Sequence, residues 1–336
     1  MTPIADQRAP ARCALVFVTD AHGLDLARHA IAVAMATQDQ FDSVVLACVD
    51  FAPPADAALQ ALAVRRGIAL ECQRIDLADM PVVSSDGAGA HAHVTAATFA
   101  KIFALDRLAG TFDRALYVDI DALLMRPFDI RGLDFEGHPI AAVFDFAIAS
   151  GYDNGGEIFR RTATAGRSPD YFNAGVIAVD FSAWRADFVA RFTSEAQRHR
   201  EHCDYKSGCS NNDQCCWNMA FERNWKKLPL ACNFQGCAMF NPGWHDAVVR
   251  HYVGARKFLP VRVWRNDRLD LAMIDRARHD LGLPALRRPP LAGLVRRLNS
   301  RRNRTRAQRM HAAITALAAR LGNVPQPPFS PGETKL

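Results

Sequence analysis

The sequence lacks the long apolar runs that carry a chain across a membrane. No apolar stretch in its 336 residues reaches the roughly 20 residues that a bilayer-spanning helix needs. Residues 1–12 include Asp6 and have no apolar core before a cleavage site, so we expect no signal peptide and a cytosolic protein. The composition is 49% hydrophobic, which suffices for one large core, and we expect one domain with an appendage rather than two equal domains.

Four widespread catalytic motifs are absent as well. No G-x-G-x-x-G follows the first apolar run, and the chain has no G-x-x-x-x-G-K-[ST], no H-E-x-x-H and no G-x-S-x-G. These motifs mark nicotinamide dehydrogenases, P-loop ATPases, zincins and α/β-hydrolases, in that order. The sequence therefore lacks the main evidence for each of these four enzyme classes.

Cysteine pairs of the zinc-knuckle type are also lacking. Six of the nine cysteines lie between Cys203 and Cys237, but none of them forms a C-x₂-C pair. Buried or idle thiols are the favoured interpretation for a reducing cytosol. A disulfide, or a structural metal that also uses His199 and His202, remains the alternative.

Charge is present in both signs, but it is unevenly placed. Residues 281–336 carry ten Arg and one Lys against the single acid Glu333, a local charge of about +10, whereas the whole chain is only +6. The first 280 residues are therefore mildly acidic, at about −4, and the high pI does not indicate a nucleic-acid-binding body. We expect a catalytic domain over residues 1–265 and a basic, partly helical tail over residues 266–336.

The tail carries a second functional prediction. Residues 291–298 combine apolar side chains with two arginines, and five more arginines follow by position 309. A basic amphipathic segment of this kind binds an anionic membrane surface, which predicts a peripheral protein on the inner face of the membrane. A solvated tail and nucleic-acid contact are the alternatives, and we expect no nucleic-acid partner.

Apolar runs alternate with helix-forming segments in the first 75 residues. The expected order is strand, helix, strand, helix, strand, at 14–18, 27–36, 43–49, 55–66 and 69–75. This alternation predicts an α/β fold with a doubly wound sheet and right-handed crossovers. Further expected elements are loops at 84–92 and 147–170, helices at 95–108, 188–199 and 213–221, and strands ending at 119 and spanning 140–144, 172–180 and 250–254.

Two carboxylates interrupt the apolar run that begins at Arg114. In an extended strand, Asp119 and Asp121 would share one face. Two such groups repel one another unless a cation or protons lie between them. At the end of a strand that opens into a crevice, the pair predicts a metal site for an anionic ligand. A hydrated acidic turn without a ligand is the alternative.

Five separated signals fit one another: Asp20 after the first strand, Lys101 on the preceding helix, the D-x-D itself, Asp213-Gln214 at a helix start, and the run His251 to Lys257. Together with Tyr171 to Val176, they resemble glycosyltransferase family 8. This family comprises retaining nucleotide-sugar transferases such as the bacterial lipooligosaccharide galactosyltransferases and the glycogenins. The resemblance extends from about Cys13 to Pro260.

The resemblance implies a GT-A fold, a Rossmann-like mixed sheet flanked by helices, and a divalent cation, usually manganese. Asp119, Asp121 and His251 match the family's metal ligands, and two carboxylates with one imidazole suit Mn²⁺ better than Mg²⁺ or Ca²⁺. A core histidine in a strand is the alternative for His251.

Further positions match the family's donor-binding residues. Gly254 and Lys257 match residues that approach the phosphates, although Phe258-Leu259-Pro260 stands where Pro-Trp commonly follows the Lys. Asp20 matches a base or ribose contact, with an acidic turn residue as its alternative. The other expected donor contacts are His22, where an Asn is common, His93, Ile120, and Lys101, where the lipooligosaccharide enzymes have Arg.

The pocket for the transferred sugar matches Asp145, Asn173, Ala174, Asp213 and Gln214. Gln214 resembles the side chain near the anomeric carbon, and an amide is a poor nucleophile. We therefore expect front-face departure and attack, with the leaving phosphate helping to take the acceptor proton. Asp213 and Asp145 are the candidates if a carboxylate takes part.

The resemblance implies transfer of galactose or glucose from a UDP-sugar to a saccharide acceptor, such as lipopolysaccharide or another surface glycan. Two other functions compete with it. In a haloacid-dehalogenase-like phosphatase Asp119 would be the nucleophile, but residues 251–257 would have no role. A non-catalytic sugar-nucleotide-binding scaffold is disfavoured by the intact Asp119, Asp121 and His251.

Overall fold

A computed structural model gives the structure of the protein. It describes residues 11–53, 55–80, 96–149, 171–202, 212–239, 241–254, 257–259 and 267–286, with five further residues between 312 and 319. The predicted loop at 84–92, most of the predicted loop at 147–170, and most of the basic tail lie outside the described residues.

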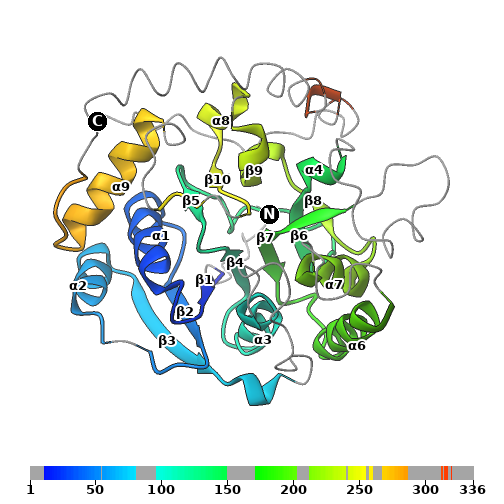
Figure 1. Ribbon diagram of the computed structural model, residues 1–336. Helices are drawn as coiled ribbons and strands as arrows, with labels where there is room; N and C mark the ends of the chain where they lie inside the picture. Colours follow the sequence, from blue (N-terminus) through cyan, green and yellow to red (C-terminus); the bar gives the residue numbers. More distant parts are fainter. Residues whose placement is uncertain are drawn as a thin grey trace, which may run out of the picture.

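The N-terminal part forms the parallel half of a seven-stranded sheet (Figure 1). Strands β1 (Cys13–Thr19), β2 (Ser43–Val49) and β3 (Ala69–Ile75) alternate with helices α1 (Leu24–Thr37) and α2 (Ala57–Arg66). β2 pairs in parallel with both β1 and β3. Every residue of β1 and β2 is buried, as their continuous apolar runs predict. The predicted alternation is confirmed in this half.

The other half of the sheet makes it a mixed one. β4 (Arg114–Val118) pairs in parallel with β1 and antiparallel with β7 (Phe172–Asp180). Beyond β7 come β6 (Ile140–Phe144) and the short β8 (Lys226–Lys227), in the order β3-β2-β1-β4-β7-β6-β8. β4 therefore lies at the centre, where parallel pairing gives way to antiparallel pairing.

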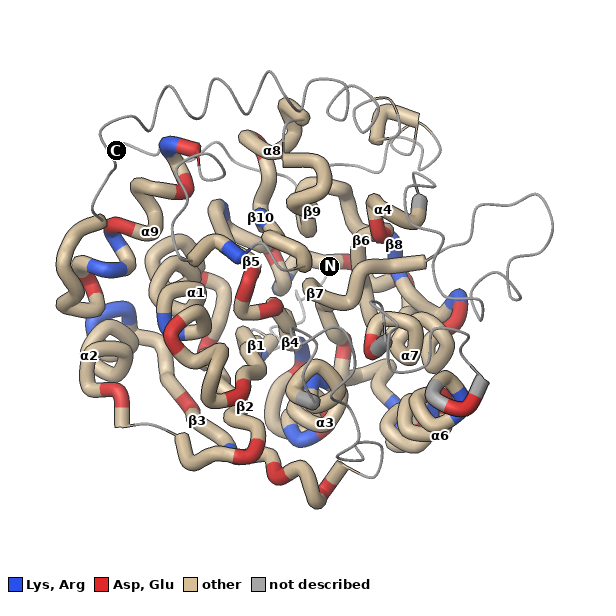
Figure 2. The backbone as a smooth tube through the Cα atoms, viewed as in Figure 1, with Lys and Arg blue, Asp and Glu red and all other residues tan. Residues whose placement is uncertain are grey.

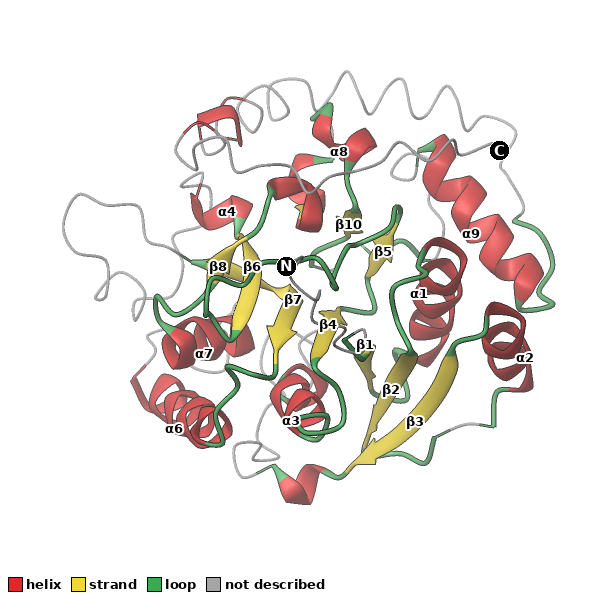
Figure 3. Cartoon of the chain, turned by 180° about the vertical axis from the view of Figure 1, so that it is seen from behind, coloured by secondary structure: helices red, strands yellow, loops and turns green. Residues whose placement is uncertain are grey.

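Helices cover both faces of this sheet. α1, α2 and α9 (Arg268–Asp280) lie on one side, and α3 (Ala100–Asp106), α6 (Asp187–His202) and α7 (Asn212–Phe221) lie on the other (Figures 1 and 3). The helix predicted over residues 95–108 is a 3-10 turn, Ala96–Thr98, followed by the shorter α3. In the view of Figure 2, basic and acidic residues are interspersed over the helices, as a mildly acidic body predicts.

A small second sheet stands at the end of β4. It contains β5 (Ala122–Leu124), β10 (Val249–His251) and β9 (Phe234–Gln235), with β10 antiparallel to β5 and parallel to β9. Short helices border it: α4 (Phe146–Ala149), α8 (Gly243–Asp246), and the 3-10 turns Leu230–Asn233 and Gly236–Ala238. A further 3-10 turn, Leu77–Asp79, follows β3.

The predicted boundary at residue 265 precedes α9, which packs against α1. The extent of the catalytic domain stays a prediction, but residues 268–280 lie on the body rather than apart from it. No helix within the described ranges combines the length and the hydropathy needed to cross a bilayer.

Candidate metal and sugar-nucleotide site

A tight turn, rather than an extended strand, brings Asp119 and Asp121 together. β4 ends at Val118, and the N–H of Ala122 donates to the carbonyl of Asp119 at 2.9 Å, which closes a turn over residues 119–122. β5 then begins at Ala122 and pairs in the small sheet. The prediction that strand alternation puts both carboxylates on one face is therefore wrong in its geometry, because the chain passes from one sheet to another between them.

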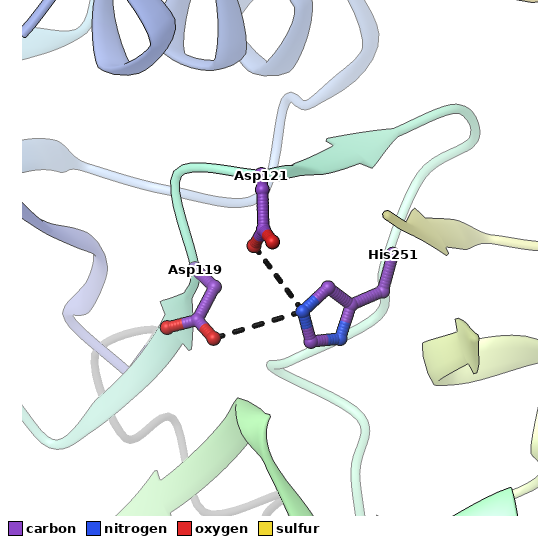
Figure 4. Close-up of side chains that lie close together, drawn as sticks. All are labelled: Asp119, Asp121 and His251. Carbon is purple, nitrogen blue, oxygen red and sulfur yellow. Dashed lines mark ion pairs between the residues drawn. The ribbon is translucent and has the colours of Figure 1, made fainter. Parts of the chain in front are cut away.

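The register of the small sheet brings His251 to the same place. His251 lies opposite Ala122 in the β10–β5 pair. Its Nε2 is 3.2 Å from Oδ1 of Asp121 and 3.6 Å from Oδ2 of Asp119 (Figure 4). One ligand atom from each residue lies within 4.8 Å of the others. His251 is buried, yet it faces two carboxylates rather than hydrocarbon, so the core-histidine alternative does not apply.

This cluster fits a divalent cation on two grounds. The first is its donor set, two hard carboxylates and one imidazole. The second is the space kept free by Gly175 of β7. A Cβ at this position would lie 2.1 Å from Cε1 of His251 and 2.7 Å from Oδ2 of Asp119. Only glycine leaves room there, so the chain keeps a small cradle open beside the three ligand atoms.

Positive charge already surrounds the carboxylates. Nζ of Lys257 lies 2.5 Å from Oδ2 of Asp121. Burial favours the neutral acid, but the charges of Lys257 and His251 outweigh it and hold the pKa of Asp121 below its ordinary value. Asp121 is therefore ionised at neutral pH and ready to bind a cation.

Lys101 is a buried part of the site and not a solvated helix lysine. Its Nζ lies 3.1 Å from Oδ1 of Asp119 and 3.0 Å from Oδ2 of Asp213, and it donates to the carbonyl of Ala174 at 3.3 Å. Burial would lower the pKa of Lys101, but the two carboxylates raise it overall. The hydroxyl of Tyr117 also donates to Asp119. These contacts fix the orientation of the Asp119 carboxylate.

Four of the five residues predicted for the sugar pocket form a connected polar network, whereas Asp213 pairs with Lys101. Nδ2 of Asn173 donates to Oδ2 of Asp145 at 3.1 Å and to Oε1 of Gln214 at 3.0 Å. Nε2 of Gln214 donates to the same Asp145 oxygen at 3.1 Å, and the N–H of Ala174 donates to Oε1 of Gln214 at 3.2 Å. All four residues are buried. The amide of Gln214 is therefore held in one orientation.

Asn233 links this network to the metal site, although no sequence pattern predicts a role for it. Its Nδ2 donates to Oδ1 of Asn173 at 2.9 Å, which turns its Oδ1 toward Nδ1 of His251 at 3.0 Å. A neutral His251 whose Nδ1–H donates to Asn233 would present the lone pair of Nε2 to a cation held by Asp119 and Asp121. Asn233 ends a 3-10 turn of irregular sequence, where no periodicity or motif marks it.

A cavity of about 890 Å³ opens beside the cluster. Its lining includes Asp119, Asp121 and Lys257 near the small sheet, and Asp20 and His22 near the start of α1. Three predicted donor contacts thus lie around one cavity with the acidic pair.

The remaining predicted donor contacts are placed as follows. Ile120 and Lys101 also line the cavity. Oδ1 of Asp20 accepts from the N–H of Gly23 at 2.9 Å, so it also acts as a turn residue. Gly254 has φ +83°, a conformation that favours glycine, but it does not line the cavity. His93 lies outside the described residues.

The cysteine-rich region yields no metal cluster within the described part of the chain. Cys215 and Cys232 are buried and form no disulfide. Burial raises the pKa of the Cys232 thiol to about 12, which makes it an inert side chain. Cys203 and Cys209 lie outside the described residues, so the alternatives that involve them stay open.

Comparisons with known proteins identify the family of this chain. Residues 28–259 match the model of a family described as glycosyl transferase family 8. Over 122 residues, the chain is 28% identical to the probable glycosyl transferase Gly of Streptococcus gordonii. That match covers 36% of this chain and 15% of the streptococcal protein.

Solved glycosyltransferases share the fold. The apo structure of the bifunctional glycosyltransferase WbbM matches with a TM-score of 0.58 and 15% identity, over 88% of this chain and 52% of that one. The galactosyltransferase LgtC, in complex with donor and acceptor sugar analogues, matches with a TM-score of 0.57 and 19% identity, over 83% and 99%. This chain therefore spans about half the length of WbbM, and its fold is the GT-A fold predicted from the sequence.

Proposed function

Because this chain belongs to glycosyltransferase family 8, we propose that it is a metal-dependent, retaining hexosyltransferase. It moves galactose or glucose from a UDP-sugar to a saccharide acceptor, such as lipopolysaccharide or another surface glycan. The observation that supports this most is the convergence of Asp119, Asp121 and His251 beside a large cavity.

Asp119, Asp121 and His251 would hold the cation, for which Mn²⁺ is the best fit. When bound, the ion neutralises the charge that develops on the departing nucleoside diphosphate. Lys257 now pairs with Asp121 and lines the cavity, so its ammonium is placed to turn toward a phosphate when a cation replaces it at the carboxylate. Lys101 stays with Asp119 and Asp213 and keeps the carboxylate of Asp119 aimed at the ion.

We propose that the transferred sugar is bound next to the buried amides and Asp145, which do not line the cavity themselves but adjoin it through Lys101, whose Nζ donates to the carbonyl of Ala174. Gln214 is fixed by Asp145, Asn173 and the Ala174 N–H, so its amide is pre-organised to position the anomeric carbon. Since an amide is a poor nucleophile, the reaction proceeds by departure and attack on one face. The leaving phosphate helps to take the acceptor proton.

Asp213 and Asp145 remain the carboxylates that would act if a covalent intermediate forms. Both are already engaged, Asp213 by Lys101 and Asp145 by the two amides. These contacts favour positioning roles for both residues.

We also propose that the basic tail attaches the enzyme to the inner face of the membrane, where a lipid-linked acceptor would be found. The ten arginines that follow residue 280 support this.

The proposed function can be tested by measuring the hydrolysis of a panel of UDP-sugars with and without Mn²⁺. We expect Mn²⁺-dependent release of UDP from UDP-galactose or UDP-glucose, and loss of this release in Asp121→Asn. Absence of metal-dependent turnover with every UDP-sugar would contradict the proposal.

A further inference from the structure

One wall of the cavity comes from a segment beyond the C-terminal end of the family match. The match ends at residue 259, yet Arg278 of α9 and the turn at 284–286 line the same cavity as Asp119 and Asp121. The residues that match the family model therefore do not supply the whole lining, and Arg278 and residues 284–286 contribute to it from outside the match.

This segment is anchored to the small sheet at its start. Nη1 of Arg250 lies 2.7 Å from Oδ2 of Asp267 and 2.6 Å from Oδ1 of Asp270. The hydroxyl of Tyr252 donates to the other oxygen of Asp270 at 2.5 Å. Arg250 and Tyr252 flank His251 in the sequence, so the first turn of α9 is fixed to the segment that carries the imidazole of the metal site.

The segment is equally well held at its end. The N–H of Leu283 donates to the carbonyl of Arg278 at 2.7 Å, and Nε of Arg278 donates to the carbonyl of Pro284 at 2.7 Å. The N–H of Leu286 donates to Oδ1 of Asp275 at 2.8 Å. Gly282, with φ +70°, allows the reversal. These hydrogen bonds hold residues 278–286 in a fixed turn. The two Nη groups of Arg278 make no hydrogen bond within the described chain.

Arg278 belongs to the end of the cavity formed by α1. α9 packs along α1 in Figures 1 and 3. Leu26 of α1 lines the same cavity as Arg278. Asp25 from the first turn also lines the cavity.

The elongated shape of a sugar nucleotide indicates which part of it would occupy each end of the cavity. If the diphosphate lies at Asp119 and Asp121, the nucleoside of an elongated sugar nucleotide extends toward Asp20 and Arg278. A pyrimidine such as uracil presents carbonyl oxygens at its edge and a flat apolar face. A guanidinium donates to such oxygens, and Pro284 and Leu286 offer apolar surface for the ring.

We propose that Arg278 and residues 284–286 form a nucleobase subsite, in which Arg278 donates to a base carbonyl while Pro284 and Leu286 cover the ring. The subsite rests on the proposed function, because it requires a nucleoside diphosphate in the cavity. It makes residues 267–286 part of the donor site.

Calorimetric titration of the full-length protein tests this subsite, with UDP and with inorganic pyrophosphate as ligands, both in Mn²⁺. In Arg278→Met we expect UDP to bind about tenfold more weakly and pyrophosphate to bind within about twofold of the wild type. Arg276→Met is the matched control, because Arg276 lies exposed on the same helix and does not line the cavity. It should bind both ligands like the wild type.

Unchanged UDP binding in Arg278→Met would overturn the subsite, as would an equal loss for UDP and pyrophosphate. Leu286→Ala leaves the bond between Arg278 and Pro284 in place, and it should weaken UDP binding severalfold but not pyrophosphate binding. Wild-type affinity of Leu286→Ala for UDP would also count against the subsite. If the wild-type protein itself binds neither ligand with Mn²⁺, the proposed function fails, and the subsite fails with it.

Discussion

Glycine at position 175 decides whether a cation can enter the site. The two carboxylates come from one turn and the imidazole comes from β10, and Gly175 of β7 lies against Asp119 and His251 with no side chain to fill the space. A single methyl group at position 175 would occupy the volume beside both His251 and Asp119.

We expect Gly175→Ala to weaken Mn²⁺ binding by about 10- to 100-fold, the range seen when groups around metal ligands are disturbed. The added Cβ would otherwise lie 2.1 Å from Cε1 of His251, so the imidazole must turn away. Electron paramagnetic resonance of free Mn²⁺ measures the affinity. Gly67→Ala is the control: its site is open but its φ of +66° makes Ala costly, by about 1 kcal/mol of stability. Equal Mn²⁺ affinity in both variants would count against the cradle.

Asn233 is a second residue that sets the orientation of the His251 imidazole. We expect Asn233→Ala to reduce Mn²⁺ affinity by about 10- to 100-fold, because Nδ1 of His251 loses the partner that fixes its tautomer. The same titration measures it. Asn224 contacts Nδ1 of His138 at the same distance of 3.0 Å on the surface, so Asn224→Ala is a control of matched chemistry. If Asn233→Ala retains wild-type affinity, Asn233 does not position the imidazole.

At the scale of elements, α9 and β10 are joined by a buried ionic cluster. Arg250 is fully buried and bonded to both Asp267 and Asp270, which also form the capping box of α9. The helix therefore begins beside β10, the strand that carries the proposed metal ligand His251.

Removing the arginine leaves these carboxylates buried without a counter-charge. We expect Arg250→Met to lower the free energy of unfolding by about 3–5 kcal/mol, as measured by urea denaturation. The control is Arg126→Met, which breaks an exposed ion pair with Asp246 and should cost no more than about 1 kcal/mol. Similar losses in the two variants would contradict a structural clamp at Arg250.

Many of the strand limits can be predicted from the sequence. β2, β6 and β7 have the predicted limits because apolar runs bounded by polar residues mark buried strands. β3 also has its predicted limits, although it is a partly exposed edge strand that contains Glu71, Gln73 and Arg74. The turn that joins Asp119 to Asp121 cannot be predicted from the sequence, since local alternation does not show that the chain changes sheets there. Asn233 and Arg278 acquire their contacts only through tertiary packing, so no local pattern identifies them.

At the scale of the whole molecule, the chain combines a nearly neutral body with a basic C-terminal tail. We expect the full-length protein to bind vesicles that contain phosphatidylglycerol and not vesicles of phosphatidylcholine alone. Replacement of Arg296, Arg297, Arg301 and Arg302 by Gln should abolish most of this binding, because each Arg near an anionic surface contributes about 1 kcal/mol. Vesicle sedimentation measures the bound fraction.

The control for the tail replaces four exposed arginines of the body, Arg66, Arg107, Arg223 and Arg276, by Gln. It changes the net charge by the same amount and should leave vesicle binding intact. Equal losses in the two variants would mean that overall charge, rather than the tail, brings the protein to the membrane.

The most direct test of the whole account is a Mn²⁺ titration of the wild-type protein, His251→Ala and Asp121→Asn, in the presence of UDP. The account predicts one Mn²⁺ bound per wild-type chain together with UDP, and affinity at least about tenfold lower in each variant. Wild-type affinity in His251→Ala would show that the imidazole does not ligate the ion, and the metal site inferred from these three residues would be wrong.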